Sequence, residues 1–187
     1  MRQRLISTAT ALLTDAGVEA VTLRGIAKAA GVSHGAPLRH FSGRAELLSV
    51  VATRGFTQLL DRGSHLPDGT PRERLTAACH AYVDFALSNP AMFELMFRRD
   101  LTDPGEPGLA SASSIVFDFF AKLVHEDREA AKDGRLREGT DSRLVAASLW
   151  AALHGLAQLW LWGGLAGASF APSPESALAV TLDAYLG

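Results

Sequence analysis

The sequence predicts an all-α protein of about nine helices, and three observations lead to this fold class. Apolar residues recur at the three- and four-residue spacing of amphipathic helices along nearly the whole chain. No segment shows a convincing alternation of apolar and polar residues, which is the pattern of a half-buried strand. About 48% of the 187 residues are hydrophobic, so the chain can bury a sizeable core.

The first two helices are expected before residue 30. An apolar stripe with helical spacing comprises Leu5, Ala9, Leu12, Leu13 and Ala16. Gly17 follows this stripe and suits a helix C-cap, because glycine adopts left-handed backbone angles at little cost. Thr22 is expected to cap a short second helix that runs through Ala29, and Gly31 supplies the turn after it.

A third and a fourth helix follow that turn. The third is expected to start at Ser33 or a neighbour, and it contains Pro37. Proline is tolerated only in the first turn of a helix, and it disfavours helical angles at the residue before it. We therefore expect Ala36 to leave the helical region and the third helix to begin late, near that residue. Ser42 is expected to cap the fourth helix, which reaches about Arg62.

The remaining helices start at recognisable cap residues. After a linker over 64–71, the run Thr70-Pro71-Arg72-Glu73 forms a capping box with proline at the first helical position. That helix is expected to end near Ser88, and Asn89-Pro90 begins a short one. A Pro/Gly loop is predicted over 100–108. A long helix that reaches Lys132 follows, and its apolar face is marked by Ile115, Val116, Phe119, Phe120 and Leu123. Gly134 and Gly139 bracket a turn, and helices over about 141–163 and 174–186 close the chain.

Charge is distributed unevenly along the chain. Residues 1–54 carry seven Arg and Lys against three Asp and Glu, a net of +4, whereas the remainder has a net of −6. A basic head on an acidic body is the asymmetry expected when only one end of a protein meets a polyanion. Cys79 is the only cysteine, so no internal disulfide is possible, and no secretion signal opens the chain. We expect a cytoplasmic protein.

One segment admits a membrane-spanning alternative. Residues 144–174 contain no Asp, Glu, Lys or Arg, and the segment is long enough to cross a bilayer. His154 and Gln158, however, fall on one helical face, and Gly163-Gly164 interrupts the segment. We favour a helix that is buried on both sides, by its own core and by a partner subunit, and expect no membrane association.

The segment TLRGIAKAAGVSHGAPLRHF, residues 22–41, has the organisation of a helix-turn-helix. Small or apolar residues that let two short helices cross closely are Ile26, Ala27, Ala30 and Val32. Polar residues that remain for the outer face are His34, Arg39 and His40. The second helix of such a motif is sized for the major groove of DNA. A glycine-containing turn between helices is common in helical hairpins, and the basic character of residues 1–54 strengthens the DNA-binding interpretation.

Residues 4–51 resemble the TetR family of bacterial transcriptional repressors. The resemblance rests on the Thr-x-x-x-Ile-Ala start, the Gly-Val-Ser turn, the His-Phe end and the basic-x-Glu-Leu-Leu that opens the fourth helix. The rest of the chain resembles one of the variable regulatory domains of that family. NPAMFELMF, residues 89–97, and LWAALHGLAQLW, with its Trp150, His154 and Gly155, are similar to the C-terminal type named for Trp, His and Gly.

The resemblance implies a set of DNA-contacting residues in this sequence. They are Thr22, Arg24, Ser33, His34, Gly35, Ala36, Leu38, Arg39, His40 and Arg44. Arg24 would reach a base edge or a phosphate, residues 33–36 would lie at the groove floor, and the last three would meet the backbone. The alternative for the arginines is a solvated surface charge, and His40 could instead cap or pack. Leu38 occupies the position of a phosphate-binding tyrosine in the family, so one expected contact is absent.

The body of the chain is expected to hold a small apolar or aromatic effector, because Met and aromatic side chains in a helical body suit adaptable pockets. The expected ligand-binding residues are Phe85, Met92, Phe93, Met96, Phe117, Phe120, Trp150 and His154. Polar groups expected in this pocket are few: His154, Gln158, His80 and Tyr82. For His154 the alternative is a hydrogen-bonded core residue. His80 and Asp84 lie four residues apart but lack a second pair, so we expect no metal.

Taken together, these patterns predict a ligand-responsive transcriptional repressor, with a DNA-binding domain over 1–45 and a regulatory and dimerisation domain over 46–187. Its expected partners are a near-palindromic double-stranded operator, an apolar or aromatic effector and a second copy of the chain. We expect no cofactor and no enzymatic activity, since no nucleophile–base–orienter set or phosphate-binding glycine loop is present. The alternative is a helical small-molecule-binding protein or enzyme whose head no longer binds DNA, which the replacement of the tyrosine by Leu38 would explain.

Overall fold

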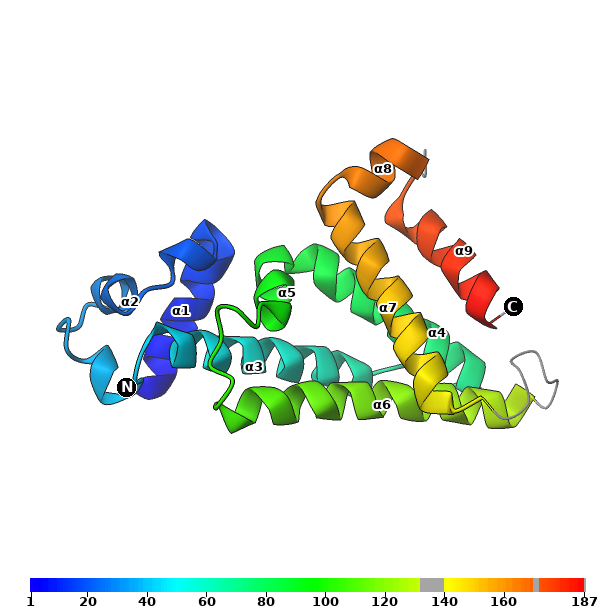
Figure 1. The fold of residues 1–187 in the computed structure, drawn as a ribbon, viewed down its shortest axis with the longest axis horizontal. Coiled ribbons are helices and arrows are strands. Elements are labelled where there is room, and N and C mark those ends of the chain that lie inside the picture. The colour runs from blue at the N-terminus through cyan, green and yellow to red at the C-terminus, as the bar shows by residue number, and fades with distance from the viewer. Residues whose placement is uncertain (132–139, 170–171, 187) are drawn as a thin grey trace. The chain divides into compact units, whose positions relative to one another are not determined.

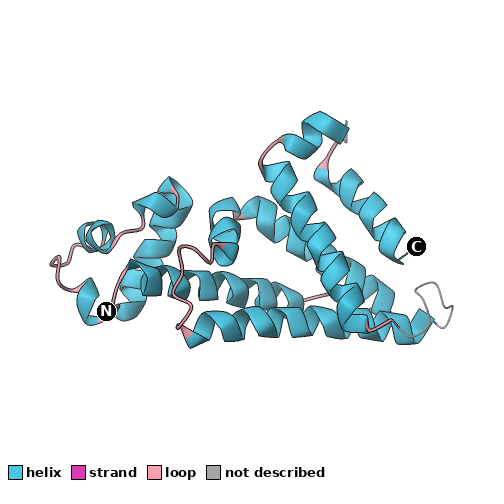
Figure 2. Cartoon of the chain, in the orientation of Figure 1, coloured by secondary structure: helices cyan, strands magenta, loops and turns pink. Residues whose placement is uncertain are grey.

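The computed structural model describes residues 1–131, 140–169 and 172–186, and these residues are helical with short connections (Figures 1 and 2). The elements are α1 (Arg2–Ala16), the 3-10 turn η1 (Val18–Ala20), α2 (Leu23–Ala29), the 3-10 turn η2 (Pro37–Arg39), α3 (Arg44–Ser64), α4 (Pro71–Ser88), α5 (Pro90–Phe97), α6 (Pro107–Ala131), α7 (Ser142–Leu161), α8 (Gly164–Ser169) and α9 (Pro174–Leu186). The described residues form no strand, and the predicted all-α fold of about nine helices is confirmed.

Cap residues set several of these boundaries as predicted. Gly17 ends α1 with a φ of 77°, in the left-handed region that glycine adopts most readily. The Thr70 backbone N–H donates to the Glu73 carboxylate at 2.8 Å, and the Glu73 N–H donates to the Thr70 hydroxyl at 3.3 Å, which completes the capping box before α4. The predicted helix over 141–163 ends instead at Leu161, because Gly163 takes a φ of 75°, and α8 follows as a separate element. The turn predicted at 134–139 lies outside the described residues.

The chain divides into two compact units. The first comprises Met1–Gln58 and Asn89–Ser114, and the second comprises Leu59–Ser88 and Ile115–Gly187. Helices α3 and α6 therefore each contribute residues to both units. The division by function at residues 45 and 46 remains a prediction.

The core of the first unit forms where α1 packs against η1, α2 and α5. Side chains that are almost completely buried there include Leu5, Ile26, Phe41, Leu47, Phe93 and Leu95. A Cβ atom added to Gly55 in α3 would lie 2.6 Å from the Met96 sulfur and 2.9 Å from the Met92 sulfur, so these two side chains of α5 pack directly on the backbone of α3.

The core of the second unit forms where α7 packs against α4 and α9 (Figure 1). The buried side of α7 consists of Val145, Ala146, Leu149, Leu153, Leu156 and Ala157. By length and composition alone α6 and α7 could each cross a membrane. In α7, however, this buried face belongs to the core of the second unit, and burial of its opposite face by a partner subunit stays a prediction.

An ion pair holds three helices of the second unit together. Among the described residues, Asp127 of α6 is the single charged side chain that is buried, with a side-chain exposure of 6%. Arg72 of α4 donates to its two carboxylate oxygens at 2.6 and 3.1 Å, and also to the backbone carbonyl of Leu186 at the end of α9. Removing one partner of a buried pair leaves an uncompensated charge, which costs more than the pair itself contributes.

We expect Arg72→Met to lower the free energy of unfolding by about 2–3 kcal/mol, below the range of about 3–5 kcal/mol for fully buried pairs, because the Arg72 side chain is 42% exposed. The matched control is Arg74→Met, whose 3.4 Å pair with Glu126 is partly exposed on both sides; we expect about 1 kcal/mol or less there. Urea unfolding at a fixed protein concentration measures both. Equal effects of the two substitutions would contradict the special role of the Arg72–Asp127 pair.

Candidate nucleic-acid interface and effector cavity

The first helix of the helix-turn-helix is fixed by its cap. Thr22 has extended backbone angles, and its hydroxyl accepts a hydrogen bond from the Gly25 N–H at 2.9 Å, which satisfies one of the free donors at the start of α2. Ile26 and Ala27 of α2 are completely buried. Gly31 makes the following turn with a φ of 65°, as predicted. Arg24 and Lys28 remain on the exposed side of α2.

The recognition segment differs from a regular helix. Residues 34–36 form a turn, and the helical part is the single 3-10 turn η2, with Pro37 at its first position. The predicted late start is confirmed, but the predicted displacement of Ala36 is wrong, since its φ of −63° and ψ of −42° are helical. The Ala36 N–H donates to the Ser33 carbonyl at 2.9 Å, and Pro37 is buried. This turn and this packing outweigh the disfavoured, though allowed, conformation before proline.

The outer face of this segment carries most of the predicted DNA contacts. Its exposed members are Ser33, His34, Gly35, Leu38 and Arg39, and its half-buried members are Ala36 and His40. Leu38 is 60% exposed, so its side chain is available to a partner that contacts this face. Pro37 and Phe41 are the inward-facing members that anchor the segment.

Arg44 lies at the start of α3, and its guanidinium group braces the helix-turn-helix. It donates to the backbone carbonyl of Val21 at 2.8 Å and to that of Val18 at 2.7 Å, and it lies 3.5 Å from a carboxylate oxygen of Glu19. One third of the side chain stays exposed. The predicted phosphate contact of Arg44 is therefore accompanied by a structural role that the sequence did not suggest.

Two further arginines support the motif and were missed in the sequence. Arg4 of α1 donates to the Ala30 carbonyl at 2.6 Å and so satisfies an acceptor at the end of α2. The guanidinium carbon of Arg2 lies 5.2 Å from the centre of the Phe41 ring, a cation–π distance. The only signal in the sequence is that both arginines precede the apolar stripe of α1, and this does not identify their partners.

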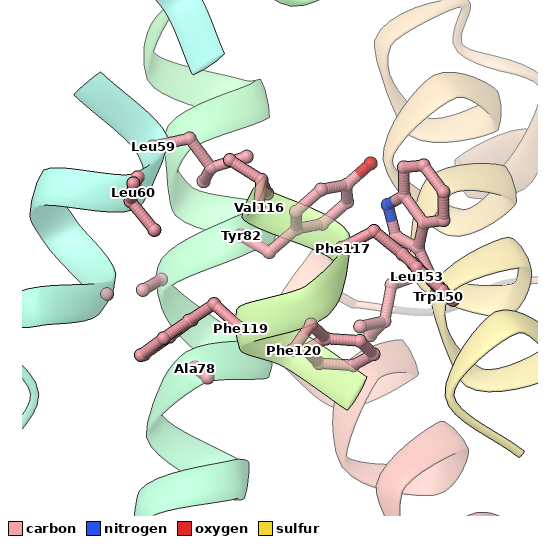
Figure 3. A pocket seen from close by; sticks show the side chains of 12 residues that line it. Leu59, Leu60, Ala78, Tyr82, Val116, Phe117, Phe119, Phe120, Trp150 and Leu153 are labelled. Atoms are coloured by element: carbon pink, nitrogen blue, oxygen red, sulfur yellow. The ribbon is translucent and has the colours of Figure 1, made fainter. Parts of the chain in front are cut away.

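A small apolar cavity lies within the second unit (Figure 3). Its lining comes from α3 (Leu59, Leu60, Gly63), α4 (Ala78, Ala81, Tyr82), α6 (Val116, Phe117, Phe119, Phe120) and α7 (Trp150, Leu153). The space open to the centre of a water-sized sphere is about 40 Å³. One water needs about 10–15 Å³ by this measure, so a larger molecule must displace lining side chains to enter.

The polar groups of the cavity are few and uncharged. The Tyr82 hydroxyl lies 2.9 Å from Nδ1 of His154, within hydrogen-bond distance. Burial raises the pKa of Tyr82 well above its usual range and lowers the pKa of His154, so both side chains are neutral near pH 7. Phe117 and Trp150 pack against each other with ring centres 5.4 Å apart. The cavity thus offers aromatic surface with one hydrogen-bonding corner.

The structure brings together only part of the predicted ligand set. Phe117, Phe120 and Trp150 line the cavity, and His154 reaches it through Tyr82. Phe85 is buried in the same unit, with the Arg62 guanidinium 5.3 Å from its ring centre. The remaining members, Met92, Phe93 and Met96, are buried in the first unit. Lining residues absent from the predicted set include small ones, namely Gly63, Ala78 and Ala81, because small side chains carry no signal of a cavity in a sequence.

Within the described residues, no group of three or more His, Cys, Asp or Glu side chains is arranged to hold a metal ion. His80 and Asp84 line a different hollow from the apolar cavity. Cys79 is completely buried, and burial raises the pKa of its thiol to about 12, so it stays protonated and unreactive.

Known proteins resemble this chain along its whole length. The HTH-type transcriptional repressor KstR of Rhodococcus jostii is 28% identical over 186 residues, which cover 100% of this chain and 82% of KstR. The HTH-type transcriptional activator FasR of Mycolicibacterium smegmatis is 28% identical over 162 residues, 86% of this chain and 72% of FasR. A solved structure of a protein of unknown function from Rhodococcus sp. RHA1 has a TM-score of 0.81 and 32% identity, and the match covers 99% of this chain and 93% of that one.

Two known protein families match separate segments of the chain, one containing the helix-turn-helix and the other containing most of the cavity. The family described as "Bacterial regulatory proteins, tetR family" matches residues 5–51, which contain the helix-turn-helix. The family described as "Tetracyclin repressor-like, C-terminal domain" matches residues 75–185, which contribute α4, α6 and α7 to the cavity. The TetR family regulator PfmR of Thermus thermophilus has the same fold, with a TM-score of 0.69, 21% identity and coverage of 98% of this chain and 97% of PfmR. The chain therefore belongs to the TetR family of DNA-binding transcriptional regulators.

Proposed function

We propose that this regulator represses transcription as a homodimer on a near-palindromic operator and that a small apolar or aromatic effector releases it. The observation that carries the effector half of this proposal is the aromatic cavity with its single polar corner at Tyr82 and His154. Repression is supported by KstR, a named repressor that this chain matches along its whole length. FasR, a named activator, shows that relatives of similar identity also act in the opposite direction.

The exposed face of the helix-turn-helix supplies the DNA contacts of this proposal. Arg24 and Arg39 are exposed, and an arginine can bond a guanine edge with two hydrogen bonds or neutralise a phosphate. Residues 33–36 would lie at the floor of the major groove of DNA, and His40 would meet the phosphate backbone. In a two-fold symmetric dimer the two recognition segments must be about 34–36 Å apart, one turn of DNA, to read both half-sites at once.

Leu38 provides a test of the DNA-facing surface. We expect Leu38→Tyr to tighten operator binding by about 1 kcal/mol, the contribution of one net hydrogen bond, because this exposed position would present a hydroxyl to the phosphate backbone. Fluorescence anisotropy with a labelled operator measures the change. Leu38→Phe is the matched control, since it adds the ring without the hydroxyl and is expected to gain less. Unchanged or weaker binding by the Tyr variant would show that the side chain at position 38 does not reach the phosphate backbone of DNA.

Exposed apolar residues of α7, which carries no charged residue after Arg143, and of α9 support the proposed dimer. TetR regulators typically form dimers, and in this chain the exposed large apolar side chains of these two helices and the turn after α7 are Leu144, Leu159, Trp162 and Val180. Exposures of 66% for Leu144 and 70% for Trp162 are high for such residues. Ala151 and Ala179, also exposed, would let two helices approach closely. A second copy that packs on this face would bury it in a four-helix interface.

The cavity restricts the chemistry of the part of the effector that enters it. A charge placed among these aromatic side chains would be unpaired, which is costly. The body of the effector should therefore be uncharged, with one or two groups that hydrogen-bond to Tyr82 or His154. Helix α3 provides a connection to DNA binding, since it begins with Arg44 at the helix-turn-helix and ends with Leu59, Leu60 and Gly63 at the cavity.

The experiment is a thermal-shift screen of apolar and aromatic compounds, followed by calorimetry of each hit with and without operator DNA. Thermodynamic linkage requires that the operator weaken effector binding by the same factor by which the effector weakens operator binding, typically about 5–150-fold. Hits whose affinity is indifferent to operator DNA would refute the switch and leave a constitutive regulator with a binding cavity.

A further inference from the structure

A second hollow opens beside the aromatic cavity within the same unit. It is a groove of about 540 Å³, between the end of α3, the linker after it and α4. Ala81 lines both the groove and the cavity. Its neighbours divide between the two hollows, since Ala77 faces the groove and Ala78 faces the cavity. On α3 the same division separates Arg62, which lines the groove, from Gly63, which lines the cavity.

The boundary between the two hollows is therefore built from small side chains. An added Cβ on Gly63 would lie 2.7 Å from a ring carbon of Phe119, so this ring rests directly on the α3 backbone. Displacement of the Phe119 ring would enlarge the cavity on this side. Ala81 is the one described residue that lines both hollows, so a molecule that extends from the cavity into the groove would pass this small side chain.

The groove, unlike the cavity, has charged and titratable walls. They are Arg62, His65, Arg72, Glu73, His80 and Asp84. Three of these groups are engaged within the fold. Arg72 bonds to Asp127, and His65 Nδ1 lies 2.8 Å from the Asp61 carbonyl oxygen. Glu73 accepts backbone and side-chain hydrogen bonds from Thr70, which lower the pKa of its carboxyl. The Arg62 guanidinium, stacked at 5.3 Å over the Phe85 ring and exposed, is a permanent positive charge beside the boundary.

Donors outnumber acceptors among the groups that remain. Arg62 and His80 can each donate a hydrogen bond, whereas Asp84 is the opposing carboxylate. An anionic group would meet the Arg62 guanidinium and the His80 imidazole while it keeps contact with water. The same group inside the cavity would be desolvated among aromatic rings.

We propose that the effector is amphipathic, with an apolar body in the aromatic cavity and an anionic head group, such as a carboxylate, sulfonate or phosphate, in the groove against Arg62. This inference rests on the proposed effector site and names the chemical class of its ligand. The molecule passes Ala81 between the cavity and the groove. The Asp84 carboxylate repels an anionic head group and so weakens its binding.

Two fluorescent probes test this assignment on the full chain without DNA. Anilinonaphthalene sulfonate and phenylnaphthylamine share the same aromatic skeleton, but only the first carries an anionic group. We expect Arg62→Gln to weaken the sulfonate probe about fivefold, the loss of an exposed charge-assisted contact, and to leave the neutral probe unchanged. Asp84→Asn should strengthen the sulfonate probe alone. Ala81→Trp should weaken the sulfonate probe more than the neutral one, because it closes the boundary.

Arg62→Lys keeps the charge and should keep the affinity for the sulfonate probe, which separates loss of charge from loss of packing on Phe85. Arg74→Gln removes an arginine that lines neither hollow and should leave both probes unchanged. Parallel changes of the two probes in Arg62→Gln and Ala81→Trp, or indifference of the sulfonate probe to both, would overturn the assignment. These readouts contain no DNA, so failure of the effector switch would appear only in the operator titrations.

Discussion

Replacing Ala151 by arginine is expected to convert the dimer into monomers at micromolar concentration and to weaken operator binding about 100-fold or more. Ala151 is exposed on α7, seven residues after Leu144 and eight before Leu159, so all three share one helical face. A guanidinium group in an apolar interface would be desolvated without a partner, which costs several kcal/mol. A monomer also reads one half-site at a time and loses the advantage of linked binding, about 10²–10⁴ in affinity.

Light scattering and an operator gel shift measure the two effects. Ala110→Arg is the matched control, because Ala110 is exposed on α6 in the first unit and lies outside the proposed dimer face. The control should stay dimeric and bind the operator normally. A wild-type chain that is monomeric at micromolar concentration would contradict the proposed architecture, and an Ala151→Arg dimer would move the interface to another face.

Arg44→Ala is expected to weaken operator binding about 10–100-fold, more than the loss of one phosphate contact. The guanidinium group bonds the Val18 and Val21 carbonyls, and hydrogen bonds from charged groups contribute about 1.5–3 kcal/mol each. These bonds join the start of α3 to the residues that precede the Thr22 cap of α2. Their loss should loosen the helix-turn-helix. If Arg44 also meets a phosphate, the slope of the logarithm of the binding constant against the logarithm of the salt concentration should fall in magnitude by about one.

Two comparison variants separate bracing from direct contact. Arg44→Lys keeps the charge but cannot reproduce both carbonyl bonds, so it should behave like Arg44→Ala if bracing dominates and like wild type if the phosphate contact dominates. Arg24, by contrast, forms no hydrogen bond or ion pair within residues 1–131, 140–169 and 172–186, and Arg24→Ala should leave the free energy of unfolding unchanged while it relaxes base preference at one position. Unaltered operator affinity in both alanine variants would show that the assigned DNA contacts are wrong.

Local signals explain why the helices could be predicted. The N-cap at Thr22, the capping box at Thr70 and the C-cap at Gly17 are determined by residues within one turn, and each lies where the sequence indicates. The recognition segment was harder to predict, because proline only disfavours helical angles at Ala36 and the packing of Pro37 decides the outcome. The sequence predicts a helix that ends at about Gly163. The left-handed angle of Gly163 separates α7, which ends at Leu161, from α8, a separate element that the sequence did not suggest.

Sites that depend on contacts between distant residues could not be read from the sequence. Arg72 and Asp127 are 55 residues apart, and Arg44 meets a carbonyl 26 residues earlier, so neither partner is visible in a local pattern. The aromatic residues of the body were recognised as core, but composition does not tell which of them face a cavity. Met92 packs instead on Gly55 in the first unit.

The most direct test of the central claim is a selection of binding sites from random DNA, followed by anisotropy titrations of the selected duplex and a scrambled one at several salt concentrations. Sequence-specific repression by a dimer predicts a near-palindromic site with half-sites about 10–10.5 base pairs apart. It also predicts affinity that falls steeply with salt and exceeds that for the scrambled duplex by about 10³ or more. No enriched sequence, or equal affinity for both duplexes, would contradict this and indicate a helical ligand-binding protein whose head no longer reads DNA.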